Sequence, residues 1–416
     1  MTTSEKTAPD HAFVWIWLPG AHDPVVAGRL EELGEVLAFT YARSYVARPD
    51  AVPLYLPELP LGPGRRRPAS GLDVAGCIAD AAPDAWGRRV ILARHLGHVD
   101  RMSDTDDLSL LTYLLESGSD RIGALDFQAS PTEYIPRSPS RQAGLEELMA
   151  AADHLQAGTP LSPDIAEALV RGTSIGGARP KALLYDGGRS LIAKFSSSSD
   201  TYPVVKAEAA AMWLAQEAGI RVPASRNIEV VGKDVLVVER FDRDGVGGRR
   251  QIVSALTMLG LSEMTGRYAT YPDLADLIRA RFTEPTATLR ELFTRIVFNV
   301  AVGNNDDHAR NHAAFWDGTA LTLTPAYDLC PQPRSGNETA QAMAIGRDGS
   351  RDSRFSVCVA AAGEYLLDKS DAQEVVDHVV GTIDERWPEA ADTARLTQVE
   401  RDRLWHRQIL NESVFY

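Results

Sequence analysis

Residues 303–315, GNNDDHARNHAAF, contain a dense cluster of polar residues that directly follows an apolar stretch. The stretch before it, ELFTRIVFNVAVG at 291–303, has the composition of a buried helix. Polar side chains at the end of a buried element are costly unless they bind something. The segment is therefore a candidate functional site. Its Asn, Asp and His members are Asn304, Asn305, Asp306, Asp307, His308, Asn311 and His312.

The spacing inside this segment is that of a protein-kinase catalytic loop. Asp306 and Asn311 are five residues apart, as are the kinase Asp that accepts the substrate proton and the Asn that holds magnesium. Asp328 follows in LTPAYDL, after a β-type run, where a kinase places its second metal-binding Asp. The order of the three predicts phosphoryl transfer. Two alternatives stay open: a helix-capping loop, and a zinc site at His308 and His312, although no HExxH motif is present.

Three further segments fit a nucleotide site less specifically. GTSIGGARPKALL at 172–184 is glycine-rich and could let backbone N–H groups approach phosphate, but it is neither a Walker A loop nor GxGxxG. Lys194 lies in a predicted strand, and a predicted helix carrying Glu208 follows, which is how kinases orient phosphates. A solvated lysine and glutamate would fit equally well. VLVVERFDR at 235–243 could face an adenine or simply end a strand.

Elements before residue 130 read as strands, loops and short helices. FVWIWL at 13–18 and VLAFTYA at 36–42 predict strands, and AGRLEELGE at 27–35 predicts a turn or one helical turn between them. Residues 53–71 are rich in Pro and Gly and predict a loop. Residues 129–144 contain three prolines and little apolar content, which predicts a domain boundary.

The rest of the chain predicts a small β-rich part and a large helical part. Hairpins are predicted at 181–197, with the turn at Asp186-Gly187, and at 227–242, with the turn at Gly232-Lys233. A helix is predicted between them at 204–220. Another helix is predicted earlier in the chain, at 162–172. Residues 250–416 are predicted to be mostly helical, with one strand-like insert. The predicted domains are 1–135, 136–245 with the Gly-rich loop, and 246–416 with the catalytic and metal-binding loops.

Composition excludes several classes of protein. The chain has 416 residues, with 43 Lys and Arg against 57 Asp and Glu, a net charge of −14 that argues against a general nucleic-acid binder. Three distant cysteines favour a reducing cytoplasm over a disulfide framework. The first residues do not read as a secretory signal, and no run of about 18 apolar residues predicts a membrane span.

Taken together, the motifs resemble the HipA family of bacterial Ser/Thr kinases. The resemblance covers nearly the whole chain and rests on SIGGARPK at 174–181, AKF at 193–195, VERFDR at 238–243, NNDDHARN at 304–311, TPAYD at 324–328, PLYLPELPL at 53–61 and DAAPDAWGRR at 80–89. It implies an α+β, two-lobed protein-kinase-like fold related to phosphoinositide kinases. A mixed α/β subdomain would precede it, and its C-terminal lobe would be mostly helical.

The resemblance also implies a function and partners. The implied activity is that of an ATP- and Mg²⁺-dependent Ser/Thr kinase, the toxin of a type II toxin–antitoxin pair. The implied substrate belongs to the translation machinery, such as an aminoacyl-tRNA synthetase. The implied antitoxin is HipB-like, a small helix-turn-helix protein through which DNA would be reached indirectly, and no membrane is implied.

Site roles follow from the same resemblance, position by position. Asp306 would be the catalytic base, Asn311 and Asp328 would hold magnesium, and Lys194, supported by Glu208, would hold the phosphates. The remaining implied nucleotide-binding residues are Gly176, Gly177, Ala178, Arg179 and Lys181 in the phosphate-side loop, Glu239, Arg240 and Phe241 beside the adenine, and His308 and Tyr327 nearby. Ser174 falls where the family has a serine that autophosphorylates and switches the kinase off.

The sequence departs from the family pattern at two places, and two other functions stay open. Arg179-Pro180 stiffens the predicted loop, and Asp307 adds a charge beside the predicted base. A small-molecule or lipid kinase is an alternative, since D-x-H-x-x-N also resembles the phosphoinositide-kinase loop. A pseudokinase that acts as a repressor partner in a DNA-bound complex is the other. There the cluster Arg65-Arg66-Arg67 could touch DNA phosphates, although a solvated loop explains it more simply.

Overall fold

The computed structural model describes residues 9–96, 104–137, 144–159, 166, 169, 179–196, 200–334, 336 and 339–416. The chain forms two compact units, each described below by itself. The first comprises Met1–Ile192, Asp242–Ile252 and Asp317–Thr319, and the second Ala193–Phe241, Val253–Trp316 and Ala320–Tyr416. The domain limits predicted from the sequence stay predictions.

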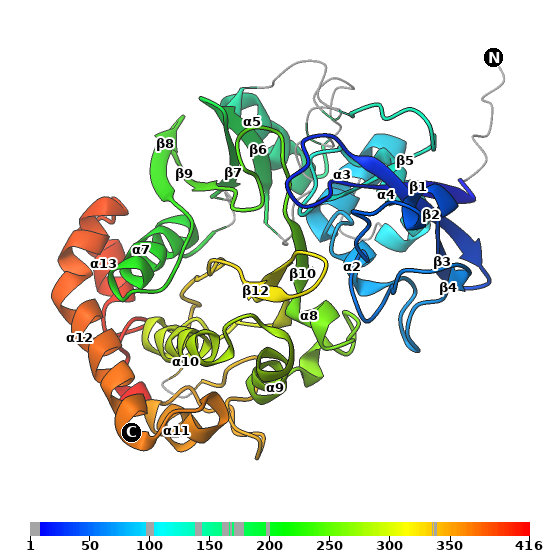
Figure 1. Ribbon diagram of the computed structural model, residues 1–416. Coiled ribbons are helices and arrows are strands. Elements are labelled where there is room, and N and C mark those ends of the chain that lie inside the picture. Colours follow the sequence, from blue (N-terminus) through cyan, green and yellow to red (C-terminus); the bar gives the residue numbers. More distant parts are fainter. Residues whose placement is uncertain are drawn as a thin grey trace. The chain divides into compact units, whose positions relative to one another are not determined.

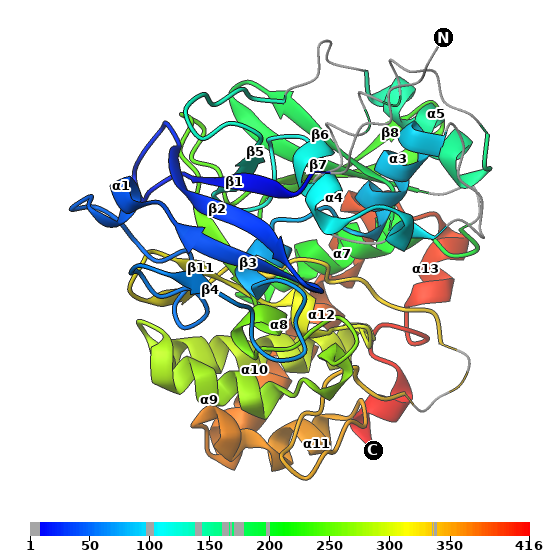
Figure 2. The same ribbon diagram turned by 90° about the vertical axis from the view of Figure 1, so that its right-hand side faces the viewer.

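The first unit is built on an antiparallel sheet in the order β4-β3-β2-β1-β5 (Figure 2). Its described elements are β1 (His11–Ile16), β2 (Val25–Leu33), β3 (Val36–Tyr41), α1 (Arg43–Val46), β4 (Arg65–Arg66), α2 (Gly76–Ala79), α3 (Ala85–Leu96), η1 (Thr105–Asp107), α4 (Leu110–Glu116), β5 (Leu125–Gln128), α5 (Leu145–Gln156) and β6 (Lys181–Asp186). β1 packs against α4, and its side chains Val14 and Ile16 are buried.

The prediction of a turn or helical turn at 27–35 is wrong. Residues 27–33 belong to β2, which pairs with β1 on one side and with β3 on the other, and only Gly34 and Glu35 form a turn. Leu30 points into the core while Arg29 is exposed, so the segment has the alternation of a half-buried strand. Pairing on both edges outweighs the weak strand propensity of its Gly and Glu residues.

The second unit contains a small sheet and a helical body (Figure 1). Its described elements are α7 (Val204–Glu217), β8 (Ser225–Val230), β9 (Lys233–Glu239), α8 (Ala255–Met258), η2 (Gly266–Tyr268), α9 (Tyr271–Arg281), α10 (Pro285–Val302), η3 (Ala309–Asn311), β11 (Ala313–Trp316), β12 (Leu321–Leu323), α11 (Phe355–Ala360), η4 (Ala362–Tyr365), α12 (Lys369–Thr393), α13 (Gln398–Leu404) and η5 (Glu412–Phe415). Two strands, β7 (Arg189–Phe195) and β10 (Gln251–Ser254), run from the first unit into the second.

Several predicted elements are confirmed. Both hairpins are present, but each turn is displaced by one residue from its predicted position. The first turns at Gly187-Gly188 instead of Asp186-Gly187, and the second at Val231-Gly232 instead of Gly232-Lys233, all with positive φ, as two-residue hairpin turns require. The helix predicted at 204–220 is α7, and Gly219 follows it with φ +81°. The helix predicted at 162–172 falls largely outside the described residues.

The helical body is organised around α10. Its side chains from Leu292 to Val302 are nearly all buried, and it packs against α9, α11 and α12. α12 packs in turn along α7, the densest contact between helices in the unit (Figure 1). Among the described residues, none of the helices has both the length and the apolar character needed to cross a membrane.

Candidate active site

The polar segment begins where α10 ends. Gly303 has φ +71°, and a Cβ at this position would lie 2.7 Å from the carbonyl oxygen of Gln408, so only glycine fits. Asn304 is buried and folds back on the helix: its backbone N–H and its side-chain amide both bond to Asn299, at 2.9 and 3.0 Å. The chain therefore leaves the helix along a fixed path.

The two adjacent aspartates have opposite environments. Asp306 is exposed, whereas Asp307 is buried. The Asp307 carboxylate accepts a hydrogen bond from the Tyr271 hydroxyl at 2.5 Å and contacts the Nε2 atom of His312 at 2.7 Å. The buried Asp307 fixes the loop through these two contacts. The neighbouring carboxylate of Asp306 is exposed and can meet a reactant.

The pKa of each aspartate follows from its surroundings. Partial desolvation raises the pKa of Asp306; His308 opposes the rise, and the negative charges of Asp328 and Asp307 add to it. Burial by itself would raise the pKa of Asp307, but His312 and the Tyr271 hydroxyl hold it below its ordinary value. The predicted like-charge effect of Asp307 on Asp306 has the expected sign and is smaller than the desolvation effect.

Asn311 and Asp328 lie on either side of the β11–β12 hairpin. The Asn311 side-chain N–H donates to the carbonyl of Asp306 at 3.3 Å, which orients its amide relative to the loop. After β12, the Tyr327 hydroxyl donates to the carbonyl of Arg310 at 2.6 Å, which ties the two segments together. Asp328 has φ +60°, an uncommon conformation for a non-glycine residue that is often found at functional sites.

Lys194 joins two carboxylates from distant parts of the unit. Its Nζ atom lies 2.5 Å from Glu208 on α7 and 2.6 Å from Asp328. Burial by itself would lower the pKa of Lys194, but the charges of Asp328 and Glu208 raise it above its ordinary value. The alternative of a solvated lysine and a solvated glutamate is wrong, because Glu208 is 5% exposed and paired.

An aromatic group lies beside these residues. The ring of Phe241, just after β9, lies 5.9 Å from the ring of Phe315 and 5.9 Å from that of Tyr327. Phe315 is buried, and the other two rings are partly exposed. Because Tyr327 directly precedes Asp328, the end of β9 is brought next to the carboxylate cluster. Glu239 is partly exposed and Arg240 is buried.

The donors present suit magnesium held together with a phosphate ligand. In the described part of the chain, no group of three His, Cys, Asp or Glu could hold a metal ion without other ligands. Mg²⁺ usually takes one or two protein oxygens and completes its shell with water and substrate phosphates. The carboxylate of Asp328 and the amide oxygen of Asn311 match that pattern. The zinc alternative gains no support, because the described residues around His308 and His312 include no group of three His, Cys, Asp or Glu that could hold a metal ion.

The predicted phosphate-side loop is only partly described. Ser174, Gly176, Gly177 and Ala178 lie outside the described residues. Arg179 is exposed in the first unit. Lys181, also in the first unit, begins β6 with a buried side chain whose Nζ atom lies 3.6 Å from Asp84.

Sequence reasoning missed several residues that support the site. Tyr271, at the start of α9, lies 36 positions before its partner Asp307, and nothing in the sequence links the two. Lys206 on α7 contacts Asp234 and Glu400 at 3.4 and 3.1 Å, again across long separations. The scarcity of lysine in this chain was the one available signal, since Lys206 is one of six.

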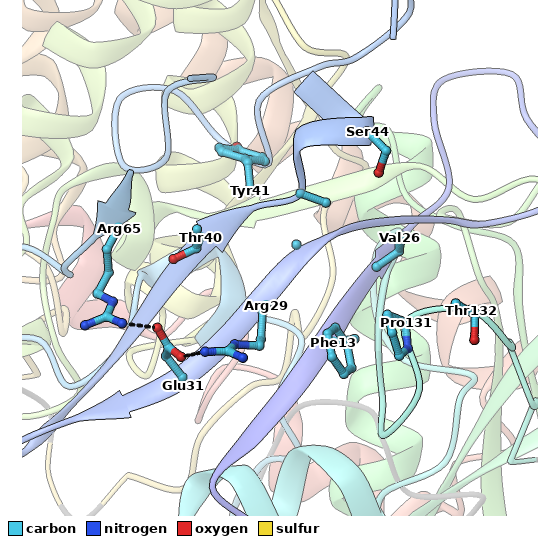
Figure 3. Close-up of a pocket in the computed structure, with 12 residues that line it drawn as sticks. Phe13, Val26, Arg29, Glu31, Thr40, Tyr41, Ser44, Arg65, Pro131 and Thr132 are labelled. Carbon is cyan, nitrogen blue, oxygen red and sulfur yellow. Dashed lines mark hydrogen bonds and ion pairs between the residues drawn. The ribbon is translucent and has the colours of Figure 1, made fainter. Parts of the chain in front are cut away.

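A separate pocket of about 740 Å³ lies on the sheet of the first unit (Figure 3). Phe13, Arg29, Thr40 and Arg65 form a row across four neighbouring strands on this face. The two arginines pair with Glu31 between them, as the dashed lines in Figure 3 show. These paired charges do not resemble the carboxylate cluster of the second unit, so the pocket is not the candidate active site.

Two known domain families match this chain in sequence. The HipA-like C-terminal domain family matches residues 173–387, and the HipA N-terminal domain family matches residues 17–128. The chain belongs to the HipA family.

Individual relatives agree with the HipA assignment. The predicted kinase Y4mE of Sinorhizobium fredii is 26% identical over 326 residues, which is 70% of this chain and 71% of Y4mE. The serine/threonine-protein kinase toxin HipA of Shewanella oneidensis is 28% identical over 186 residues, 38% of this chain and 42% of that protein. A structure of the HipA, HipB and operator DNA complex from Shewanella oneidensis matches with a TM-score of 0.68 and 20% identity, covering 95% of each chain.

These findings confirm the predicted HipA resemblance, the α+β kinase-like fold class and the prediction that the chain is a kinase. The roles assigned to individual residues stay predictions. The geometry nevertheless brings Lys194, Glu208 and Asp328 into direct contact and places Asp306 and Asn311 on one connected loop.

Proposed function

We propose that this HipA-family chain transfers the γ-phosphoryl group of ATP to a Ser or Thr hydroxyl of a protein in the translation machinery, such as an aminoacyl-tRNA synthetase. The observation that carries the proposal is the contact of Lys194 with both Glu208 and Asp328. A strand lysine held by a helix glutamate beside a metal-binding aspartate is the arrangement by which kinases orient the phosphates of ATP.

Each side chain has a task in this reaction. Lys194, held by Glu208, binds the α- and β-phosphates. Asp328 and Asn311 are the ligands for Mg²⁺, which when bound neutralises charge on the phosphate oxygens. Asp306 accepts the proton of the attacking hydroxyl, and its exposed carboxylate allows a protein substrate to approach it.

The nucleotide base has a separate site in the proposal. The partly exposed rings of Phe241 and Tyr327 would pack against the adenine, with Glu239 and Arg240 contributing backbone groups from the end of β9. His308 lies on the same exposed loop as Asp306 and would stay near the phosphates. Arg179 and Lys181, which belong to the first unit, stay predicted phosphate-side residues, and Lys181 pairs with Asp84.

Regulation is the second part of the proposal. The structural relative from Shewanella oneidensis is a complex of HipA, HipB and operator DNA. By that similarity, a HipB-like helix-turn-helix antitoxin would bind this chain and inhibit it, and DNA would be reached through the antitoxin. Autophosphorylation of Ser174 would be a second inhibitory event. A kinase that acts on translation would work in the cytoplasm.

A labelled-phosphate transfer assay tests the proposal. The purified chain is incubated with γ-labelled ATP and Mg²⁺, in parallel with a bacterial lysate and with a panel of metabolites and lipids. Label on a protein band that disappears with Asp306→Asn supports the proposal. Label on a metabolite or lipid alone would identify a small-molecule or lipid kinase. No transfer and no Mg²⁺–ATP binding would identify a pseudokinase, and the proposal would be wrong.

A further inference from the structure

We infer that Lys206 and Glu400 are positioning residues: their ion pair fixes the rotation of α7 and so keeps Glu208 on Lys194. The inference rests on the proposed function, since it concerns the same phosphate-binding lysine. The two glutamates belong to different elements, α7 for Glu208 and α13 for Glu400. The pair would make the C-terminal helices part of the nucleotide site without touching nucleotide.

The geometry of α7 carries the first step. Lys206 and Glu208 are two positions apart on the helix, which places their side chains about 200° apart around its axis. Glu208 binds Lys194 on one side. Lys206 lies 3.1 Å from Glu400 and 3.4 Å from Asp234 on the other. The N-terminal part of α7 is therefore held by ion pairs on two opposite sides. A single contact would leave the helix able to rotate about its axis.

The partners of Lys206 are themselves fixed. The Glu400 carboxylate accepts hydrogen bonds from the backbone N–H and the hydroxyl of Thr397, at 2.8 and 2.9 Å, in a capping box at the start of α13. The carbonyl of Asp234 accepts the N–H of Ser196 at 3.1 Å, two residues beyond Lys194. Asp234 thus connects Lys206 to the very strand that carries Lys194.

Burial gives this ion pair more weight than an ordinary surface pair. The side chains of Lys206, Glu400 and Asp234 are 13%, 23% and 26% exposed. Solvent screening is weaker for such partly buried charges than for fully exposed ones. Along the same helix, the Arg386 guanidinium from α12 lies over the ring of Trp213 and 2.9 Å from Glu217, so the far end of α7 is held as well.

The test measures ATP affinity and kcat for Glu400→Gln. Glutamine serves a capping box as well as glutamate does, so α13 keeps its start and only the negative charge that Glu400 presents to Lys206 is lost. We expect kcat/KM for ATP to fall about tenfold, which is less than the roughly 10²-fold that a misplacement of about 1 Å can cost. Lys206→Met should give a similar loss, and Lys206→Arg, which keeps the charge, should restore most of the activity.

The matched control is Glu229→Gln. It breaks the pair of Glu229 with Arg395, whose atoms are 2.6 Å apart. That pair also links the C-terminal segment to the small sheet, but neither of its residues belongs to α7. We expect activity within twofold of wild type. An equal loss in this control would mean that any weakening of the C-terminal segment has the same effect, and would overturn the inference.

A double-mutant comparison separates positioning from general stability. If Glu400 acts through Glu208, Glu400→Gln should change ATP affinity little in a Glu208→Gln background. The full tenfold effect in that background, or unchanged affinity in the single variant, would overturn the inference. Wild-type protein that binds no Mg²⁺–ATP would instead contradict the proposed function, so the two failures are distinguishable.

Discussion

The Nζ atom of Lys194 lies 2.6 Å from the Asp328 carboxylate, so the predicted phosphate ligand and the predicted metal ligand are bound to each other. The side chain of Asp328 is still 46% exposed. The carboxylate of Glu208 also binds the Nζ atom of Lys194. Binding of Mg²⁺ and ATP would therefore exchange a lysine–carboxylate contact for lysine–phosphate and carboxylate–metal contacts, with Glu208 keeping the lysine in place.

Magnesium-linked ATP binding is the first expected consequence. Asp328→Asn keeps the size of the side chain and removes its charge, so Mg²⁺–ATP affinity should fall by at least roughly 10- to 100-fold, the usual loss when only a hydrogen-bond partner of a metal ligand is removed. Affinity for ATP without metal should change much less, because Lys194 and Glu208 remain. Titration of a fluorescent ATP analogue with and without Mg²⁺ measures both.

Asn311→Ala gives an independent check of the metal site. Its loss should also depend on magnesium, although a neutral amide contributes less than a carboxylate. Equal binding of ATP with and without Mg²⁺ by the wild-type protein would contradict both metal assignments.

Loss of the catalytic base is the second prediction. Asp306→Asn should lower kcat by about 10²- to 10⁴-fold, the usual contribution of a general base. Because Asp306 is exposed, the free energy of unfolding should stay within about 0.5 kcal/mol of wild type. Transfer assays and thermal unfolding of the same preparation measure the two quantities. A fully active Asp306→Asn protein would refute the assignment.

The pH dependence of kcat/KM is the third prediction. A general base works only when it is deprotonated, and partial desolvation raises the pKa of Asp306. Activity should therefore fall with decreasing pH through a midpoint above about 3.9, the ordinary pKa of aspartate. A rate profile paired with circular dichroism at each pH measures the midpoint and shows that the fold is intact. A profile that is flat down to the ordinary aspartate pKa would contradict the prediction.

Modification of Ser174 is the fourth prediction. A phosphate there would add about −1.5 to −2 charges to a loop that must approach the phosphates of ATP, so it should repel the nucleotide. Mass spectrometry after incubation with Mg²⁺–ATP should find phosphate on Ser174 in wild type and none in Asp306→Asn. ATP affinity should fall as the modification accumulates. An active enzyme that stays unmodified would leave Ser174 as an ordinary turn residue.

The sequence predicted the local elements better than their partners. Hairpin turns, α7 and the polar segment after α10 follow from residues close together in the chain, and all are present. The contact of Lys194 with Asp328 spans 134 positions, and motif order predicted both residues but not that they touch. The strand β2 was missed because its pairing on both edges is a tertiary effect. Tyr271 was missed because long-range hydrogen bonds leave no pattern in a single sequence.

Stability in acid is the last prediction, and it depends on Asp307. Its carboxylate is buried and bound to His312 and Tyr271, and these partners hold its pKa below the ordinary value. A group whose pKa is lower in the folded state stabilises the fold above its unfolded pKa of about 3.9, and this contribution disappears as pH falls through the folded value. Asp307→Asn should therefore lower the free energy of unfolding at neutral pH by roughly 3 kcal/mol, since a hydrogen bond to a charged group contributes about 1.5–3 kcal/mol. The difference from wild type should shrink as the pH falls below about 4.

Asp306→Asn, one residue away and exposed, is the matched control and should show neither effect. Chemical denaturation of the three proteins across pH measures this directly. Equal stability of the two variants at neutral pH would show that Asp307 does not anchor the catalytic loop.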